Sequence, residues 1–447
     1  MGLGAYSAAV MERARNLRIG LPLASFASGH GSIDQELALL IRRLAGYALL
    51  EYCIGRQGDD DQVVIEPQTA DYWPRLPRLG KTDVLVLSRF AYMRRRGNDI
   101  VLESPRAAAL FKIRDPKITA AIATLSTPQP IKRLRRLDGL EGDELLGLLV
   151  DCEILCKVDG AGAADLRSAE GDDSLVLWDF HDLLFHTRST EGRHANPLGG
   201  LYPHAGKIPP LPAARPRWPG KKIDLRKLSA APAQTVSPVV TTLRERHSIR
   251  SFDDRRPVTL NELAQFLDGT ARVLSRWRHR EDLGDVRPVI DYAMRPYPSA
   301  GASYELELYL AVDRCEGLAP GFYHYDAGGH ALVPIAAPAH QLQALLTAAA
   351  YGMDAPGPPQ ILITLAARFG RISWKYSALA YALILKDVGV LTQTFYLMAT
   401  DMGLGGCAIG IANIDLFAKM TGLAFYVEGP VGQFALGRPA QPLSHRG

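Results

Sequence analysis

Hydrophobic and polar positions in the C-terminal half of the chain change repeatedly between helical and strand spacing. Residues 259–274 carry apolar side chains three and four positions apart, and Thr259 with Glu262 forms a capping-box pattern at their start. Residues 304–312 alternate leucine with other side chains, as a half-buried strand does. Further strands are predicted at residues 321–325, 360–366 and 431–436, and a long helix at residues 376–402. Residues 241–447 are therefore predicted to form one α+β domain with a dominant central helix.

Residues 80–160 combine a hairpin pattern with short helices. A strand is predicted at residues 83–92, and Gly97-Asn98-Asp99 is typical of a turn that leads to a returning strand at residues 100–102. Amphipathic helices are predicted at residues 118–125 and 143–152. This combination predicts a winged-helix-like module, which can bind nucleic acid or hold a peptide along a strand edge.

Two further regions complete the predicted organisation. Residues 1–75 contain a helical pattern at residues 32–50, and residues 161–240 begin with an aromatic-rich helical stretch at residues 175–185. Prolines then crowd residues 207–240. Because proline fixes φ and lacks a backbone donor, this stretch is predicted to be an extended connector. The predicted regions are thus residues 1–75, 80–160, 161–240 and 241–447.

Composition narrows the function classes. The 447 residues have a net charge of only +4, and the predicted module lacks a basic recognition helix, so a nucleic-acid partner is not favoured. The five cysteines are an odd number, which argues against a disulfide framework and for a reducing cytoplasm. Cys152 and Cys156 lack a second ligand pair nearby, so no metal site is predicted. The apolar stretch 377–402 contains Lys386-Asp387, which favours a buried core helix over a membrane span.

The segment 245–253 carries the most distinctive chemistry. Two arginines, a histidine and a serine occupy five consecutive positions, Arg246 to Arg250. Arginine offers a permanently charged donor fork and serine a neutral donor, a set that suits a phosphate. The alternative interpretation is a solvated basic turn.

Two loops rich in small residues follow. Residues 296–302 precede a predicted strand, and their small side chains allow backbone amides to approach a flat ring closely; a plain surface turn is the alternative. The glycine-rich segment 403–410 follows a helix. A dinucleotide-binding fingerprint requires a preceding strand and a following helix, so that interpretation is rejected.

Lys375 and Tyr376 are predicted to lie at the start of the long helix. A helix N-terminus lowers the cost of a tyrosinate or a neutral lysine. Both residue types have an ordinary pKa near ~10, so a base at pH 7 would require local tuning. The alternative is a solvated lysine beside a packed tyrosine.

The order of these segments resembles the nitroreductase-like flavoproteins, and is most similar to the SagB/ThcOx-type dehydrogenases that act on azoline-containing peptides. The resemblance rests on ERHSIRSF (245–252), RPYPSAGASYELELY (295–309), GFYHYD (321–326), residues 367–404 and VGQFALG (431–437). Upstream, SRFAYMRRRG (88–97) and DLLFHTRSTEGRH (182–194) resemble the long members of this group. The resemblance implies a mixed, mostly antiparallel sheet in the C-terminal domain.

The resemblance also implies bound FMN in a homodimer. Arg246, Ser248 and Arg250, with His247 alongside, would hold the phosphate and ribityl chain. The isoalloxazine ring would be bordered by Pro298, Ser299, Ala300 and Gly301. Backbone groups near Ile409 and Gly410 would face the reactive ring nitrogen, and Arg438 would add a phosphate contact.

In azoline oxidases a Lys-Tyr pair is linked to catalysis, and Lys375-Tyr376 matches it. The implied reaction oxidises a thiazoline or oxazoline of a ribosomal peptide to the azole, in a complex with the cyclodehydratase that makes the azoline. The winged-helix-like region resembles leader-peptide recognition modules. Two alternatives remain open: the same fold with a nitroaromatic, quinone or other peptide substrate, and a non-catalytic scaffold that binds a leader peptide.

Overall fold

The computed structural model describes residues 6–20, 22, 32–55, 62–70, 72–140, 142–158, 170, 172–196, 198–217, 219–225 and 237–440. Residues 226–236 of the predicted connector lie outside the described residues. The chain divides into two compact units. Unit 1 comprises residues 1–195, 367–384 and 413–430, and unit 2 comprises residues 196–366, 385–412 and 431–447.

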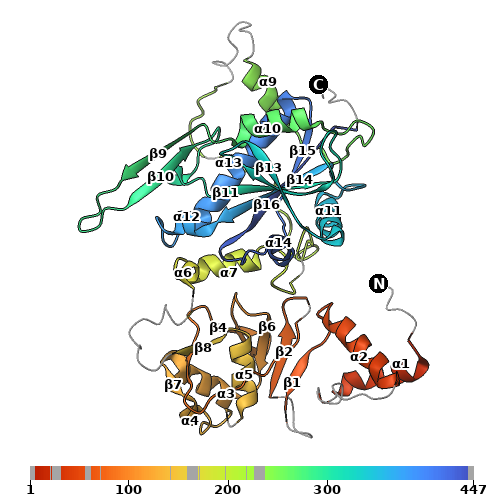
Figure 1. The fold of residues 1–447 in the computed structure, drawn as a ribbon, viewed down its shortest axis with the longest axis vertical. Coiled ribbons are helices and arrows are strands. Elements are labelled where there is room, and N and C mark those ends of the chain that lie inside the picture. The colour runs from red at the N-terminus through yellow and green to blue at the C-terminus, as the bar shows by residue number, and fades with distance from the viewer. Residues whose placement is uncertain are drawn as a thin grey trace. The chain divides into compact units, whose positions relative to one another are not determined.

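Unit 1 contains two sheets among its described residues (Figure 1). One has the order β1-β2-β6-β5-β4 and the other β7-β3-β8. The strands are β1 (Tyr52–Ile54), β2 (Val63–Pro67), β3 (Val84–Leu87), β4 (Tyr92–Arg96), β5 (Asp99–Glu103), β6 (Ala109–Ile113), β7 (Gln129–Pro130) and β8 (Leu155–Val158). The helices are α1 (Ala8–Arg15), α2 (Ser32–Ala45), α3 (Pro116–Ala123), α4 (Ile131–Leu134), α5 (Asp143–Asp151), α6 (Asp173–Val176), α7 (Phe180–Arg188), α12 (Phe369–Ser373), the start of α13 (Ala380–Asp401) and α14 (Ile414–Thr421).

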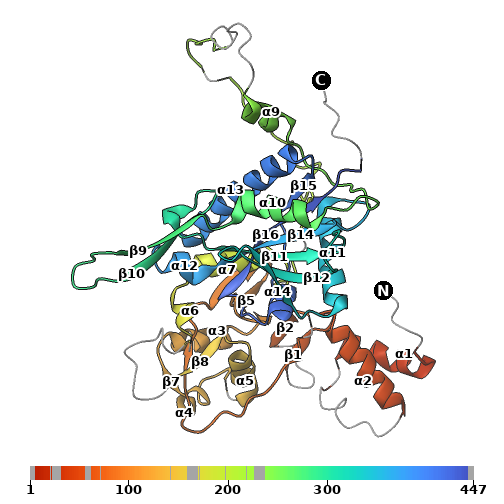
Figure 2. The same cartoon turned by 45° about the horizontal axis from the view of Figure 1, so that its top comes forward.

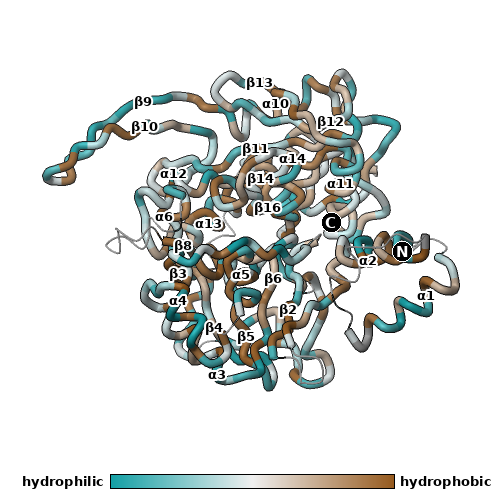
Figure 3. Tube along the Cα trace, turned by 60° about the horizontal axis from the view of Figure 1, so that its bottom comes forward, coloured by the Kyte–Doolittle hydropathy of each residue, from teal (hydrophilic) through white to brown (hydrophobic). Residues whose placement is uncertain are grey.

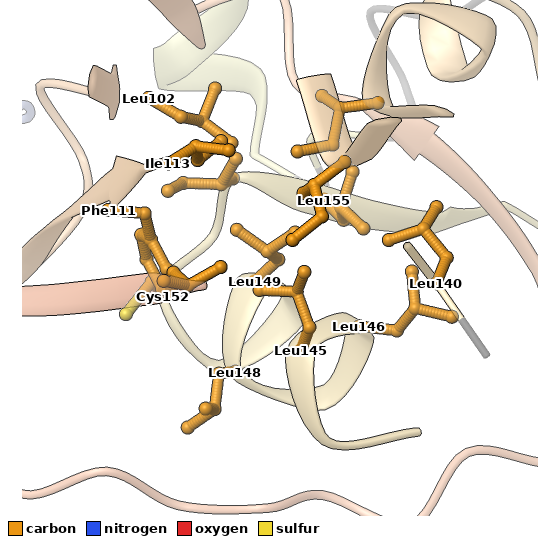
Figure 4. Packing of buried hydrophobic residues seen from close by; sticks show 14 of the residues in the cluster. Leu102, Phe111, Ile113, Leu140, Leu145, Leu146, Leu148, Leu149, Cys152 and Leu155 are labelled. Carbon is orange, nitrogen blue, oxygen red and sulfur yellow. The ribbon is translucent and has the colours of Figure 1, made fainter. Parts of the chain in front are cut away.

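The core of the N-terminal part of unit 1 joins its two sheets through α5. Leu145 and Leu149 of α5 are buried in one hydrophobic cluster with Phe111 of β6 and Leu155 of β8 (Figure 4). The amphipathic period of α5 directs these leucines to the same face. Three short strands with α3, α4 and α5 are compatible with a winged-helix-like module, which stays a prediction.

Unit 2 is built on the sheet β13-β12-β11-β14-β16-β15. Its strands are β11 (Leu306–Val312), β12 (Gly321–Asp326), β13 (Ala331–Ile335), β14 (Ile361–Arg368), β15 (Gly405–Ile409) and β16 (Glu428–Gly437). The helices of this unit are α9 (Pro238–Glu245), α10 (Leu260–Ala271), α11 (Ala339–Met353) and most of α13. The β11–β12, β12–β13 and β15–β16 pairs are antiparallel. The predicted α+β class is confirmed.

The C-terminal half of α13 packs in the core of unit 2. Helices α10 and α13 of this unit are labelled in Figure 2. Phe395 of α13 contacts Phe266 of α10 and Phe434 of β16, with ring centroids 5.3 Å apart in both pairs. By length and composition α13 also meets the criteria for a membrane span. However, Asp387 on this helix is buried and accepts hydrogen bonds from Ser299 and Ala300, as expected of a core helix.

A two-stranded hairpin, β9 (Ser275–Arg280) and β10 (Val289–Met294), extends away from the six-stranded sheet (Figures 1, 2 and 3). All six residues of β9 are exposed. Leu283 and Val286, in the loop that joins β9 to β10, expose apolar side chains at the tip of the hairpin. Trp277 and Tyr292 stack across the strands with ring centroids 5.7 Å apart. The sequence pattern did not predict this hairpin, because few of its residues are buried and no in–out alternation results.

Several predicted elements are confirmed with small shifts at their ends. The capping box of Thr259 and Glu262 begins α10, and the alternating leucines form β11. Gly97, with φ 64°, lies in the turn between β4 and β5. The predicted strands at 321–325, 360–366 and 431–436 correspond to β12, β14 and β16.

Two local predictions are wrong. The strand predicted at 83–92 is divided between β3 and β4 in different sheets, because residues 88–91 form a turn around the fully buried Phe90. The helix predicted at 175–185 is interrupted between α6 and α7. The glycine-rich segment 403–410, for which no secondary structure was predicted, contains strand β15, where Gly406 lies so close to the Phe434 ring that a Cβ atom would be 2.2 Å from it.

Candidate functional site

The arginine-bearing segment of unit 2 follows α9 and runs beside β15. The Ile249 amide donates to the Gly406 carbonyl at 2.8 Å, and the Asp253 amide donates to the Arg438 carbonyl at 2.8 Å. These backbone contacts fix the segment while leaving the side chains of His247 and Arg250 exposed.

Tyr396 of α13 organises this segment. Its hydroxyl lies 2.8 Å from Ser248 Oγ and accepts a hydrogen bond from the Ala408 amide at 2.8 Å. The Arg246 guanidinium lies over the Tyr396 ring, 5.1 Å from its centroid. Arg246 and Ser248 are thus brought together around one buried tyrosine. Sequence reasoning missed Tyr396, because its position in an apolar helix gave no local sign of this role.

The Arg250 side chain lies close to the Cys407 thiol of β15. Burial raises the pKa of the Cys407 thiol, and the positive charge of Arg250 opposes that increase. Among the residues that the structure describes, neither Arg246 nor Arg250 is paired with a carboxylate. Two uncompensated guanidinium groups and a serine hydroxyl form a cluster that can bind an anion. His247 is turned to the Glu245 carbonyl, 2.8 Å from its Nδ1.

Arg438 forms its contacts with Glu262 and Gln360 of unit 2. Its Nη2 lies 2.8 Å from both carboxylate oxygens of Glu262, and its amide donates to Gln360 Oε1 at 3.0 Å. The guanidinium charge is therefore neutralised by the capping-box residue of α10. The phosphate contact expected of Arg438 stays a prediction.

The small-residue loop 298–304 is tied to α13. The Ser299 hydroxyl and the Ala300 amide donate to Asp387 Oδ2 at 2.8 and 2.9 Å. Gly301 adopts φ 57°, a conformation that glycine reaches at little cost. On β15, Ile409 is buried and Gly410 follows it in exposed backbone, with open space where a Cβ would stand.

Lys375 and Tyr376 belong to unit 1 and lie in a turn between α12 and α13. The prediction that they begin the long helix is wrong, because α13 starts only at Ala380. Both of their amides donate to the Ile372 carbonyl, at 3.0 and 2.9 Å, so they close the preceding short helix. The Lys375 ammonium lies 5.6 Å from the Tyr376 ring centroid.

Helix α7 and the residue before it hold this turn. Asp179 accepts a hydrogen bond from the Ala378 amide, and His181 Nε2 lies 3.0 Å from the Ala378 carbonyl. Asp182 accepts from the Tyr381 amide at 3.2 Å. Ala378 adopts φ 61°, which is unfavourable for a residue with a Cβ, so these contacts hold a strained backbone in place.

A buried aromatic group supports the same region. His186 of α7 is fully buried, with its Nδ1 3.2 Å from the Tyr381 hydroxyl and its ring stacked on Trp178. Burial lowers the pKa of His186 to about 3, so this imidazole remains neutral at physiological pH. Trp178 also packs on Phe369 of α12, with ring centroids 4.5 Å apart.

Removing the Tyr396 hydroxyl is expected to destabilise unit 2. Tyr396→Phe leaves the Ala408 amide and the Ser248 hydroxyl without their common partner, at a cost of about 1–2 kcal/mol in the free energy of unfolding. Denaturant unfolding measures this loss. Tyr351→Phe is the matched control, because Tyr351 is 84% exposed and should change stability little. Equal stability of both variants would contradict the role given to Tyr396.

Comparisons with known proteins match two regions of the chain. Residues 85–195 match the family model of the cyanobactin oxidase ThcOx, and residues 243–438 match the nitroreductase family. A curated relative from Methanocaldococcus jannaschii, named "Putative nitroreductase MJ1384", is 29% identical over 168 residues, which are 38% of this chain and 76% of the relative.

Solved structures with similarity to the chain include the Escherichia coli microcin synthetase McbBCD complex with truncated pro-MccB17 bound. That match has a TM-score of 0.40 and 20% identity, and it covers 62% of this chain and 99% of the other. A second structure, described as a "putative nitroreductase" of Ralstonia eutropha, has a TM-score of 0.34 and 23% identity. That match covers 47% of this chain and 88% of the other. The family matches confirm the resemblance: residues 85–195 are a region of the ThcOx cyanobactin oxidase type, and residues 243–438 are a domain of the nitroreductase family.

Proposed function

We propose that this protein is an FMN-dependent dehydrogenase that oxidises thiazoline or oxazoline rings in a ribosomally synthesised peptide to thiazole or oxazole. The nitroreductase-family domain makes the chain an oxidoreductase. The match of residues 85–195 to the cyanobactin oxidase ThcOx supports ring oxidation on a peptide, and this observation carries the proposal.

The anion-binding cluster of unit 2 fits the phosphate of FMN. Arg246 and Arg250 would neutralise the phosphate, and Ser248 would add a neutral donor beside Tyr396. The loop at Pro298–Gly301 and the backbone at Ile409–Gly410 would border the ring system, where small side chains permit close approach.

The reaction removes a proton and a hydride from adjacent atoms of the azoline ring. When bound, FMN would supply the acceptor for the hydride, and molecular oxygen would then regenerate the oxidised cofactor. Lys375 or Tyr376 would receive the proton from the ring carbon. Their turn is held by Asp179, His181 and Asp182, so the basic group would be fixed in position before the substrate arrives.

The proposal includes partners and location. The substrate would be an azoline-containing precursor peptide delivered by a cyclodehydratase complex, with the winged-helix-like region binding the leader. A homodimer is expected from the resemblance to nitroreductase-like flavoproteins, and its interface would include the exposed face of α13, which carries Ala382, Lys386, Gly389, Val390 and Gln393. The five cysteines form no disulfide among the described residues, which supports a cytoplasmic location.

Mass spectrometry of a purified azoline peptide tests this function directly. The FMN-loaded protein is expected to lower the peptide mass by about 2 Da per ring, since each oxidation removes two hydrogen atoms. The same peptide with uncyclised cysteines is the control and should not change. No mass loss, together with fast NAD(P)H-driven reduction of a nitroaromatic, would favour the small-molecule alternative. A colourless protein that cannot be reconstituted with FMN would favour the scaffold.

A further inference from the structure

Two carboxyl groups of unit 2 meet in its interior with one hydroxyl between them. Glu305 precedes β11 and is 0% exposed, and Asp387 on α13 is 6% exposed. Ser299 Oγ lies 2.8 Å from Asp387 Oδ2 and 3.2 Å from Glu305 Oε2. Because a serine hydroxyl carries one proton, it can donate fully to only one of these oxygens.

The same atoms hold the backbone of the loop 298–304. Ser299 Oγ accepts the Tyr304 amide at 2.9 Å, and Asp387 Oδ2 accepts the Ala300 amide at 2.9 Å. Ala302 and Tyr304 adopt φ 53° and 46°, which typically costs about 1–3 kcal/mol for a residue with a Cβ. The loop therefore holds an unfavourable backbone through contacts that converge on the two carboxyl groups.

Among the described residues, no cation forms an ion pair with Glu305 or Asp387. Glu305 Oε1 is buried with no hydrogen-bond partner among the described residues. The neighbouring cation Arg295 donates to the Leu306 carbonyl at 3.2 Å and lies over the Tyr304 ring. Tyr297 and Glu307, on the segments that flank Glu305, add no compensating positive charge. Burial and the charge of Asp387 raise the pKa of Glu305 to about 7.

We propose that Glu305 and Asp387 share one proton and act as positioning residues that clamp the loop 298–304 in its strained conformation. The loop is the segment assigned above to the edge of the flavin ring, so the consequence for FMN binding rests on the proposed function. The clamp itself rests on the side-chain contacts and does not require a bound cofactor.

The shared proton has a defined consequence for stability. The pKa of Glu305 is near the ordinary glutamate value of 4.5 in the unfolded chain and is raised to about 7 in the folded protein. Its contribution to stability is therefore complete below about pH 4.5 and is lost as the pH rises through about 7. Between these values the folding equilibrium constant should fall by about tenfold per pH unit from this group alone.

Glu305→Gln tests the clamp, because glutamine keeps an N–H donor toward Asp387 and cannot ionise. Flavin-free unfolding would be measured from pH 5 to pH 9 for the wild type, Glu305→Gln and the exposed control Glu316→Gln. We expect Glu305→Gln to remove this part of the pH dependence and to gain stability over the wild type as the pH rises, while Glu316→Gln follows the wild type. Parallel curves for all three proteins would overturn the shared proton.

Two further measurements keep this test independent of the proposed function. An infrared difference spectrum between the wild type and Glu305→Gln at pH 6 should show a protonated carboxyl C=O band in the wild type; its absence would also overturn the proposal. FMN affinity is then compared at pH 6 and pH 8. If the clamp shapes the flavin site, the affinity of the wild type should fall at pH 8 and that of Glu305→Gln should not. If neither the wild type nor Glu305→Gln binds FMN while the unfolding and infrared results are as expected, the flavin assignment is refuted and the clamp is retained.

Discussion

Lys375→Ala and Tyr376→Phe should each retain bound FMN and lose turnover of an azoline peptide by more than about tenfold, the effect of removing general acid–base assistance. Both residues lie in the turn between α12 and α13, outside the anion-binding cluster of unit 2, so cofactor retention should not depend on them. Flavin absorbance measures retention, and the rate of peptide mass loss at saturating substrate measures turnover.

The same turn provides a control for this prediction. Ser377→Ala changes an exposed side chain next to the pair and should leave turnover within about twofold of the wild type, as surface substitutions do. The pH profile of kcat should lose one limb in the variant that removes the base. Normal turnover in both Lys375→Ala and Tyr376→Phe would refute the catalytic role of the pair.

The double variant Arg246→Ala, Arg250→Ala should lose FMN. Each charge-assisted hydrogen bond contributes roughly 1.5–3 kcal/mol, so removal of two guanidinium groups should weaken binding by about a hundredfold or more. Tyr396 and Ser248 remain in place, and the fold of unit 2 should persist because both arginines project from a segment held by backbone contacts. Fluorescence titration with FMN measures the affinity.

Arg244→Ala, Arg255→Ala is the matched control. These arginines are exposed, flank the same segment, and carry the same total charge. The control pair should bind FMN about as well as the wild type at physiological salt, since exposed charges outside the cluster are screened. A fully yellow Arg246→Ala, Arg250→Ala protein would contradict the phosphate assignment.

Local signals in the sequence predicted the elements whose formation depends on nearby residues. The capping box at Thr259 and Glu262 and the alternating leucines of β11 are complete within a few positions, and both elements form as predicted. The segment order predicted the nitroreductase-family domain and the ThcOx-type region, both of which the family matches confirm. The chemistry of Arg246, Ser248 and Arg250 was also evident from residue type alone.

Tertiary structure decided the features that depend on distant partners. The turn of Lys375 and Tyr376 interrupts an apolar helical pattern because Asp179 and His181, almost 200 positions earlier, bind the Ala378 backbone. Segment 403–410 becomes a strand only by pairing with β16. The roles of Tyr396 and of the Glu305–Asp387 pair also depend on distant residues. Tyr396 forms its hydrogen bond with a residue 148 positions away, and the proposed shared proton joins a carboxyl group on α13 to one that precedes β11. Neither arrangement produces a local sequence pattern. The sequence by itself therefore determined the family, the periodic elements and the candidate chemistry, and the packing of distant segments determined how that chemistry is held.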